Sequence, residues 1–275
     1  MITSNKMIGL TPNLLAPGDA KSMSLDPAAF TWTRIHSTDD PAFERAYSAL
    51  WGEFGAAHEL EAREILSERF RLRGDFCYEM LLVEKDGVFC AVRDHTAFRM
   101  DGEIVVHLSH VLVAPEHRRT GLAGWLRTAP IVTARDLASA HGISGADITL
   151  VGEMEYDDGL DPKRAIRLAA YERAGYLKLD PVAVRFFQPD FRDPSTIDKA
   201  GVSSPLPFQL LVRRIGKEHE RSVSGAQVRR IVRAIYAIYA AQLRAAEMKH
   251  PLLNIERYPA DAAVVSLVLP TAPSV

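Results

Sequence analysis

Three β-rich runs separated by two Asp-Gly pairs constrain the fold more than any other feature of the chain. The runs span residues 77–84, 88–98 and 103–113. Asp86-Gly87 separates the first two runs, and Asp101-Gly102 separates the second from the third. Asp and Gly tolerate the positive φ angles of tight two-residue turns, so each pair favours a hairpin. The middle of the chain is therefore predicted to be an antiparallel meander.

Helical and extended patterns flank this meander. Before it, the sequence predicts a strand from Phe30 and two helices, the first over residues 43–54 and the second around residues 60–70. After it come, in order, a helix from about Gly121 that Pro130 interrupts, a strand over 147–155, a helix from Asp161-Pro162 to Gly175, strands over 182–187 and 208–212, and an amphipathic helix over 228–243. Strands and helices in this order predict an α+β fold.

Composition limits the function classes. With 275 residues and 47% hydrophobic residues, the chain is long and apolar enough for a globular core. Its net charge of -2 provides no overall basic field for nucleic acid. Cys77 and Cys90 cannot form a disulfide framework, and neither a signal peptide nor an 18-residue apolar stretch is evident. We therefore expect a cytoplasmic protein without a membrane partner.

The most informative motif follows the third run of the meander. Apolar Val111-Leu112-Val113 leads through Pro115 into Arg118-Arg119-Thr120-Gly121-Leu122-Ala123, where a helix is predicted to begin. This resembles the coenzyme A signature of the GNAT acyltransferase superfamily: an apolar strand, a proline, and Arg-x-x-Gly-x-Gly/Ala opening a helix. The resemblance implies the GNAT fold, a central mixed and mostly antiparallel sheet flanked by helices, here with a C-terminal helical extension. It also implies acetyl-CoA as the acyl donor.

The spacing of this motif suits the capture of a diphosphate. A loop that enters a helix offers several main-chain N–H donors together with the positive end of the helix dipole. Gly121 lets the main chain approach phosphate oxygens, Ala123 keeps the first turn slim, and Thr120 can cap the helix. The residues expected to bind the cofactor are Val111, Leu112, Val113, Arg118, Arg119, Thr120, Gly121, Leu122 and Ala123. The alternative is an ordinary strand-loop-helix turn with solvated arginines.

A second segment, from Tyr171 to Gly175 and Tyr176, is similar to the Tyr-x-x-x-Gly-aromatic signature of the same superfamily. The resemblance implies that Tyr171 protonates the departing thiolate of coenzyme A. The alternative is a half-buried aromatic side chain that packs on a helix face. Many GNAT relatives carry an Asn seven residues before this Tyr to bind the pantetheine arm, and Arg164 stands there in this chain.

Two carboxylates form a third candidate feature. Glu153 and Glu155 lie two residues apart near the end of a predicted strand, so they share one face of it. Either can serve as a general base for an attacking amine, or can bind a cationic substrate. The alternative is a hydrated acidic strand end that continues through Asp157 and Asp158.

Other clusters of polar residues give weaker indications of function. His107 and His110 are three residues apart on one strand and therefore face opposite sides, so no metal site is predicted. Ser109 and His110 lead into the cofactor motif and can line an acceptor cleft or pack in the core. Arg229, Arg230, Arg233 and Arg244 can attract RNA or cover a solvated helix face.

Together these patterns predict an N-terminal arm over residues 1–29, a GNAT domain over 30–216 and a C-terminal helix and tail over 217–275. The tail is expected to pack on the core or on a second subunit of a homodimer. The expected reaction is acetyl transfer from acetyl-CoA to a primary amine of a small molecule. The alternatives are a non-catalytic acetyl-CoA-binding module and a GNAT enzyme whose donor is an acyl carrier protein or an aminoacyl-tRNA, which leaves tRNA open as a partner.

Overall fold

The computed structural model describes residues 9–57, 59–100, 102–192 and 194–273. The chain divides into two compact units, Met1–Leu150 and Val151–Val275. The strand β5 (Asp147–Met154) begins in the first unit and ends in the second.

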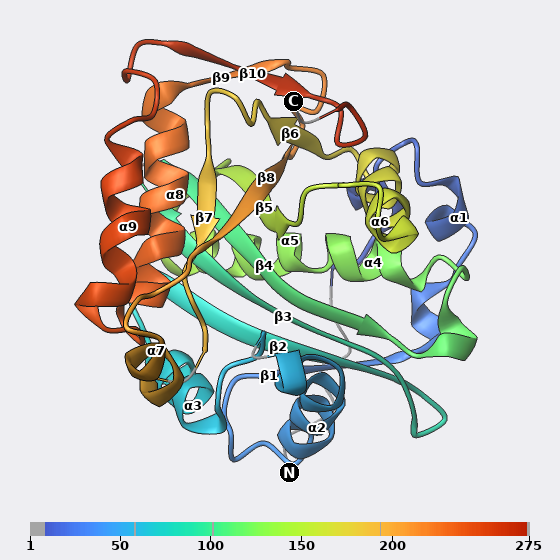
Figure 1. Cartoon of the computed structure of the whole chain (residues 1–275). Helices are drawn as coiled ribbons and strands as arrows, with labels where there is room; N and C mark the ends of the chain where they lie inside the picture. The colour runs from blue at the N-terminus through green and yellow to red at the C-terminus, as the bar shows by residue number, and fades with distance from the viewer. Residues whose placement is uncertain (1–8, 58, 101, 193, 274–275) are drawn as a thin grey trace. The chain divides into compact units, whose positions relative to one another are not determined.

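The first unit is built on an antiparallel meander (Figure 1). Its strands are β1 (Thr31–Ile35), β2 (Phe76–Lys85), β3 (Val88–Met100) and β4 (Glu103–Val113). Its helices are η1 (Pro12–Leu14), α1 (Ala20–Met23), η2 (Pro27–Ala29), α2 (Phe43–Phe54), η3 (Gly55–Ala57), α3 (Arg63–Arg71), η4 (Pro115–His117), α4 (Leu122–Thr128) and α5 (Pro130–Ala140). The predicted meander is confirmed, and its strands extend one or two residues beyond the predicted bounds where they differ.

The turns of the meander follow from their residues. Asp86 and Gly87 both have positive φ, 51° and 77°, as a two-residue type I′ turn requires. Gly102 has a φ of 75°, while Asp101 lies outside the described residues.

Alternation along β2 places apolar side chains on both faces of this sheet. Met80 and Leu82 pack in one cluster with residues of α2 and α3, whereas Leu81 and Val83 pack in another with Trp125 of α4. Successive strand residues point to opposite faces, so a sheet that is covered by helices on both sides needs such a continuous apolar run.

The segment predicted as an N-terminal arm packs against the first unit at a few buried residues, while most of its described residues are exposed. Leu14 and Leu15 are buried, and the Trp125 indole Nε1 donates to the Ser22 carbonyl at 2.9 Å. The residues just upstream of β1 therefore hold the helix that follows the motif.

The second unit is assembled from shorter strands around β8 (Leu206–Arg214). Its other strands are β6 (Leu177–Leu179), β7 (Phe186–Gln188), β9 (Ser222–Ser224) and β10 (Val264–Val268). Its helices are α6 (Pro162–Arg173), α7 (Pro194–Ala200), α8 (Gly225–Ala240) and α9 (Ala245–Ile255). Antiparallel pairs join β8 to β6 and β7, and join β10 to β6 and β9.

Predictions for the second unit are confirmed in part. α6 starts at Asp161-Pro162, where the Asp161 carboxylate accepts the Lys163 N–H at 2.9 Å. The expected pair of strands is present as β7 and β8, but its first strand begins at Phe186 rather than Val182. β6, β9, β10, α7 and α9 were not predicted from the sequence.

The long C-terminal helix α8 packs within the second unit. The Tyr236 hydroxyl donates to the Phe187 carbonyl of β7 at 2.8 Å. Arg229 is bound by main chain, since its guanidinium donates to the Ile255, Tyr258 and Pro259 carbonyls. The helix ends at Ala240, so Arg244 lies beyond it, at the start of α9.

Helices and mainly antiparallel strands thus confirm the α+β class. Across the part of the chain that the structure describes, none of the helices combines the length and apolar character needed to cross a bilayer.

Candidate functional site

The motif loop of the first unit has a left-handed backbone at two positions. Arg119 has a φ of 62° and Gly121 a φ of 104°. Between them, the Thr120 hydroxyl donates to the His117 carbonyl at 2.7 Å and accepts the Leu122 N–H at 3.4 Å. Thr120 therefore links the loop to the first residue of α4, while Gly121 occupies the N-cap position of that helix.

Main-chain donors in this loop remain available. Among the described residues, no acceptor contacts the N–H groups of Arg119, Thr120, Gly121 or Ala123. The first N–H groups of a helix have no intrahelical partner and form a natural anion site. The loop thus fits a phosphate group through its main chain.

The glycines of the motif also have a packing role that the sequence did not reveal. A Cβ on Gly121 would lie 2.5 Å from the Lys21 carbonyl oxygen, and a Cβ on Gly124 would lie 1.9 Å from the Ser22 Oγ. The close approach at Gly121 is therefore to the protein's own main chain. Lys21 and Ser22 therefore fill the space that a side chain at Gly121 would need.

Two arginines add positive charge beside these donors. Arg118 and Arg119 are both exposed, and within the described ranges neither takes part in an ion pair. The Arg118 Nε donates to the Val113 carbonyl at 3.0 Å, which holds its side chain beside the end of β4. Both guanidinium groups are thus accessible to an anion.

A bulge distorts β4 just before the motif. Arg93 pairs with Val111 and His95 pairs with Leu108, so Asp94 alone faces two residues of β4, Ser109 and His110. The Asp94 carboxylate accepts the His110 main-chain N–H at 2.7 Å. Bulges bend a strand and redirect the residues that follow it. Here the residues that follow are Val111–Val113.

A buried polar network fixes this bulge. The Asp94 carboxylate also accepts the His110 Nδ1 at 3.0 Å and the Tyr78 hydroxyl at 3.0 Å. The His110 Nε2 contacts the Glu59 carbonyl oxygen at 2.7 Å. Burial alone would lower the pKa of His110, but the Asp94 carboxylate outweighs it and raises that pKa to about 9. His110 is therefore a cation at neutral pH, with both ring N–H groups engaged.

In the second unit, Tyr171 lies on the last turn of α6 beside β5. Its ring contacts the Tyr176 ring edge-on, with centroids 4.9 Å apart, and a Cβ on Gly152 would lie 3.9 Å from its Cε1. Gly175 ends α6 with a φ of 80°, and the Tyr176 N–H donates to the Tyr171 carbonyl at 3.1 Å. This helix end fixes the position of Tyr171.

The two candidate carboxylates have different surroundings. Glu155 forms ion pairs with Arg164 at 3.3 Å and with Arg167. Glu153 accepts the Tyr239 hydroxyl at 2.6 Å and the Gln188 Nε2 at 3.0 Å. Gly152 and Glu153 are successive residues of β5 and so point to opposite faces, which places Glu153 away from the face that Tyr171 covers.

Sequence reasoning missed four residues of these networks: Asp94, Tyr78, Tyr239 and Gln188. Their partners lie far away in the sequence, up to 86 residues for Tyr239 and Glu153, so no local pattern could reveal them.

In the described part of the chain, no group of three or more His, Cys, Asp or Glu is arranged to hold a metal ion.

Comparison with known proteins gives a structural similarity only. No protein-family model matches the chain, and no curated protein matches it. An Arabidopsis thaliana Naa50 structure with a bisubstrate analogue shares 7% identity over 67% of this chain and 98% of that one, with a TM-score of 0.41. An aminoglycoside acetyltransferase from an uncultured soil metagenomic sample shares 11% identity over 54% and 88% of the respective chains, with a TM-score of 0.37.

A Desulfovibrio desulfuricans protein that is assigned to the GNAT family of acetyltransferases is also similar. It shares 16% identity over 68% of this chain and 98% of that one, with a TM-score of 0.38. The chain is thus similar in structure to acetyltransferases of this type. All three TM-scores lie below 0.5, and none bears on the substrate of this chain.

Proposed function

We propose that this protein is a GNAT-type N-acyltransferase that transfers an acetyl group from acetyl-CoA to a primary amine of a small molecule. The observation that carries the proposal is the motif loop after β4. It combines two exposed guanidinium groups, those of Arg118 and Arg119, with main-chain N–H groups that no acceptor among the described residues contacts. These N–H groups belong to Arg119, Thr120, Gly121 and Ala123.

The motif loop would hold the donor. The diphosphate of acetyl-CoA would bind the N–H groups of the loop, and the side chains of Arg118 and Arg119 would balance its charge. Acetyl-CoA supplies an activated acyl group as a thioester. Main-chain N–H groups near Leu112 and Val113, just beyond the bulge, would stabilise negative charge that develops on the carbonyl oxygen.

The sequence motifs supply candidate proton-transfer groups. A carboxylate, Glu153 or Glu155, would take a proton from the amine as nitrogen attacks the thioester carbonyl carbon. A carbon–nitrogen bond forms, the carbon–sulfur bond breaks, and the electron pair leaves on sulfur. The Tyr171 hydroxyl would then give its proton to that thiolate.

Calorimetry with acetyl-CoA tests the loop. Arg119→Gln removes one charge beside the loop and is expected to weaken the affinity by about 3-fold to 10-fold, because a contact between exposed charges contributes about 1 kcal/mol. The loss should shrink in high salt.

Arg135→Gln, at an exposed arginine of α5, is the matched control and should leave the affinity unchanged. Equal affinities for wild type and Arg119→Gln would remove Arg119 from the donor site. A wild-type protein that does not bind acetyl-CoA would refute the proposed function.

A further inference from the structure

A fully buried arginine lies under the helix that follows the motif loop. Arg93 belongs to β3, is 0% exposed and pairs with Val111 of β4. Its Nη1 donates to the Leu126 carbonyl of α4 at 3.2 Å. Among the described residues, no hydrogen-bond partner contacts its Nε or its Nη2. Arg93 thus carries a positive charge into the interior of the first unit with only one guanidinium nitrogen bonded.

The single bond of Arg93 has a local explanation that needs no charge. Pro130 has no N–H, so the Leu126 carbonyl, four residues earlier, lacks the partner that a regular α-helix would supply. Arg93 donates to this carbonyl where α4 is followed by α5. A neutral amide side chain can donate the same bond. The bond therefore accounts for a hydrogen-bond donor at this position and leaves the charge unexplained.

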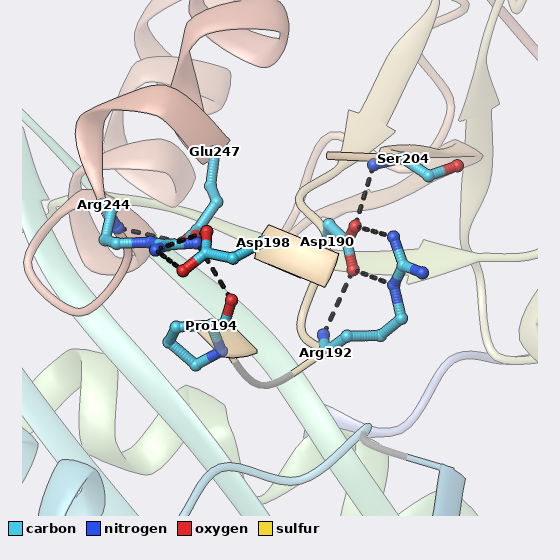
Figure 2. Close-up of polar contacts among 7 residues, drawn as sticks. All are labelled: Asp190, Arg192, Pro194, Asp198, Ser204, Arg244 and Glu247. Carbon is cyan, nitrogen blue, oxygen red and sulfur yellow. Dashed lines mark hydrogen bonds and ion pairs between the residues drawn. The ribbon is translucent and has the colours of Figure 1, made fainter. Parts of the chain in front are cut away.

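Other arginines of the protein have carboxylate partners. Arg69, which is 2% exposed, forms an ion pair with Glu61. Figure 2 shows the same arrangement in the second unit, where the Arg192 guanidinium donates to the Asp190 carboxylate at 2.6 Å. Within the described ranges Arg93 forms no such pair. A buried charge without a partner destabilises a protein, so its presence calls for a compensating role.

The polar neighbours of Arg93 on the same face of the sheet do not neutralise it. In the register of β2 and β3, His95 lies opposite Glu79, two residues along from Arg93. The Glu79 carboxylate is bound by Arg34 at 2.7 Å. Burial, and after it the charge of Arg93, lowers the pKa of His95 well below its usual value, so the His95 ring is neutral. The charge of Arg93 therefore acts beyond its own contacts.

The motif loop leads into the helix that covers Arg93. α4 starts at Leu122, and with a rise of about 1.5 Å per residue, roughly 6 Å of helix separates Leu122 from Leu126. Leu122, Trp125 and Leu126 are 0% exposed, so the space between Arg93 and the loop is apolar. A protein interior screens charge less than water does. The guanidinium can therefore act on an anion at the loop without contacting it.

We propose that Arg93 is a further binding residue for the acyl donor, and that its buried charge attracts the diphosphate held at the motif loop. This inference rests on the donor site of the proposed function and involves only the first unit. It accounts for a charged side chain at a position where an amide would satisfy the Leu126 carbonyl.

Calorimetry with coenzyme A on the full chain tests the proposal. Arg93→Gln keeps a hydrogen-bond donor for the Leu126 carbonyl and removes the charge. It should weaken the affinity by about 10-fold, the effect of one charge at roughly 10 Å with an effective dielectric constant of about 20. Arg93→Lys keeps the charge and should stay within about threefold of wild type. Unchanged affinity in Arg93→Gln would overturn the proposal.

Salt dependence separates Arg93 from the exposed arginines of the loop. A buried charge is screened much less than an exposed one. The loss in Arg93→Gln should therefore persist from about 0.05 M to about 0.5 M salt, whereas the loss in Arg119→Gln should shrink. A loss that shrinks equally in the two variants would contradict the action of a buried charge.

A purely structural role of Arg93 predicts a different result. If Arg93 served only the carbonyl that Pro130 leaves free, Arg93→Lys and Arg93→Gln would affect coenzyme A binding alike. Equal affinities of these two variants would overturn the proposal. Circular dichroism checks that each variant is folded, and Arg93→Met, an apolar replacement of similar length, takes the place of Arg93→Gln if the latter does not fold.

Activity measurements distinguish this inference from the proposed function. Wild-type protein that binds coenzyme A but acylates no amine would refute the proposed transfer, while the difference between Arg93→Gln and Arg93→Lys would still decide the role of Arg93. Normal acylation with equal affinities in these variants would overturn the role of Arg93 alone. A wild-type protein that does not bind coenzyme A would overturn both.

Discussion

Asp94 in the first unit and Glu153 in the second are both strand carboxylates that accept a tyrosine hydroxyl, at 3.0 Å and 2.6 Å. Their other partners differ. Asp94 is fully buried and also holds the cationic ring and the main-chain N–H of His110. Glu153 is half-buried and holds the neutral amide of Gln188.

The difference in partners gives Asp94 a structural role. Burial would raise the pKa of Asp94, but His110 and its hydrogen bonds lower that pKa well below its usual range. Asp94 therefore stays ionised and maintains the bulge in β4. Glu153 accepts hydrogen bonds from the Tyr239 hydroxyl and the Gln188 amide, which come from α8 and β7 of the second unit.

The strongest test of the contrast is Asp94→Asn. It leaves the His110 ring buried without its charge partner, so we expect it to lower the free energy of unfolding by about 3–5 kcal/mol. Urea denaturation measures this loss. Asp75→Asn is the control, since Asp75 forms a half-exposed ion pair with Arg99 and should cost at most about 1 kcal/mol. Similar losses in the two variants would contradict a structural role specific to Asp94.

The pH dependence of stability sharpens the contrast. The pKa of His110 is raised from 6.5 to about 9 in the folded protein, so its contribution to stability is complete below about pH 6.5 and is lost as the pH rises to 9. The shift corresponds to about 3 kcal/mol. His110→Gln should remove this part of the pH dependence when unfolding is measured from pH 6 to pH 9.5. Parallel curves for wild type and variant would contradict the assignment.

The smallest expected changes in kcat and in stability come from a comparison of Tyr171 with Tyr78. Tyr171→Phe should lower kcat by about 10²-fold, the general-acid range, and change the free energy of unfolding by no more than about 1 kcal/mol. Tyr78→Phe should do the reverse, because its buried hydroxyl serves Asp94. It should cost about 1–3 kcal/mol of stability and leave kcat within about twofold. A large loss of kcat in Tyr78→Phe would place catalysis in the first network as well.

Local signals explain what the sequence could predict. Asp86-Gly87 encodes a tight turn, the 43–54 periodicity matches α2, and Pro130 divides α4 from α5 as expected. Each of these features depends on residues within a few positions of one another. The motif loop likewise lies between a strand and a helix, as the sequence pattern predicts.

What the sequence could not predict depends on distant partners. The bulge exists because Asp94 offers its carboxylate to the His110 N–H, 16 residues away. β6 and β9 are three residues long, too short for any period to be recognised. The contact between Tyr239 and Glu153 joins two ends of the second unit, so the pattern of either segment alone does not contain it.

Gly121 and Gly124 have a practical consequence for anyone who shortens this protein. Their α-carbons lie against Lys21 and Ser22. The upstream segment therefore supports the conformation of the motif loop. A truncated protein that starts after Ser24 would lack this support, and the backbone at both glycines would no longer be held in one conformation. Loss of nucleotide affinity in such a shortened protein would then report a collapsed loop and would say nothing about the residues that touch the phosphates.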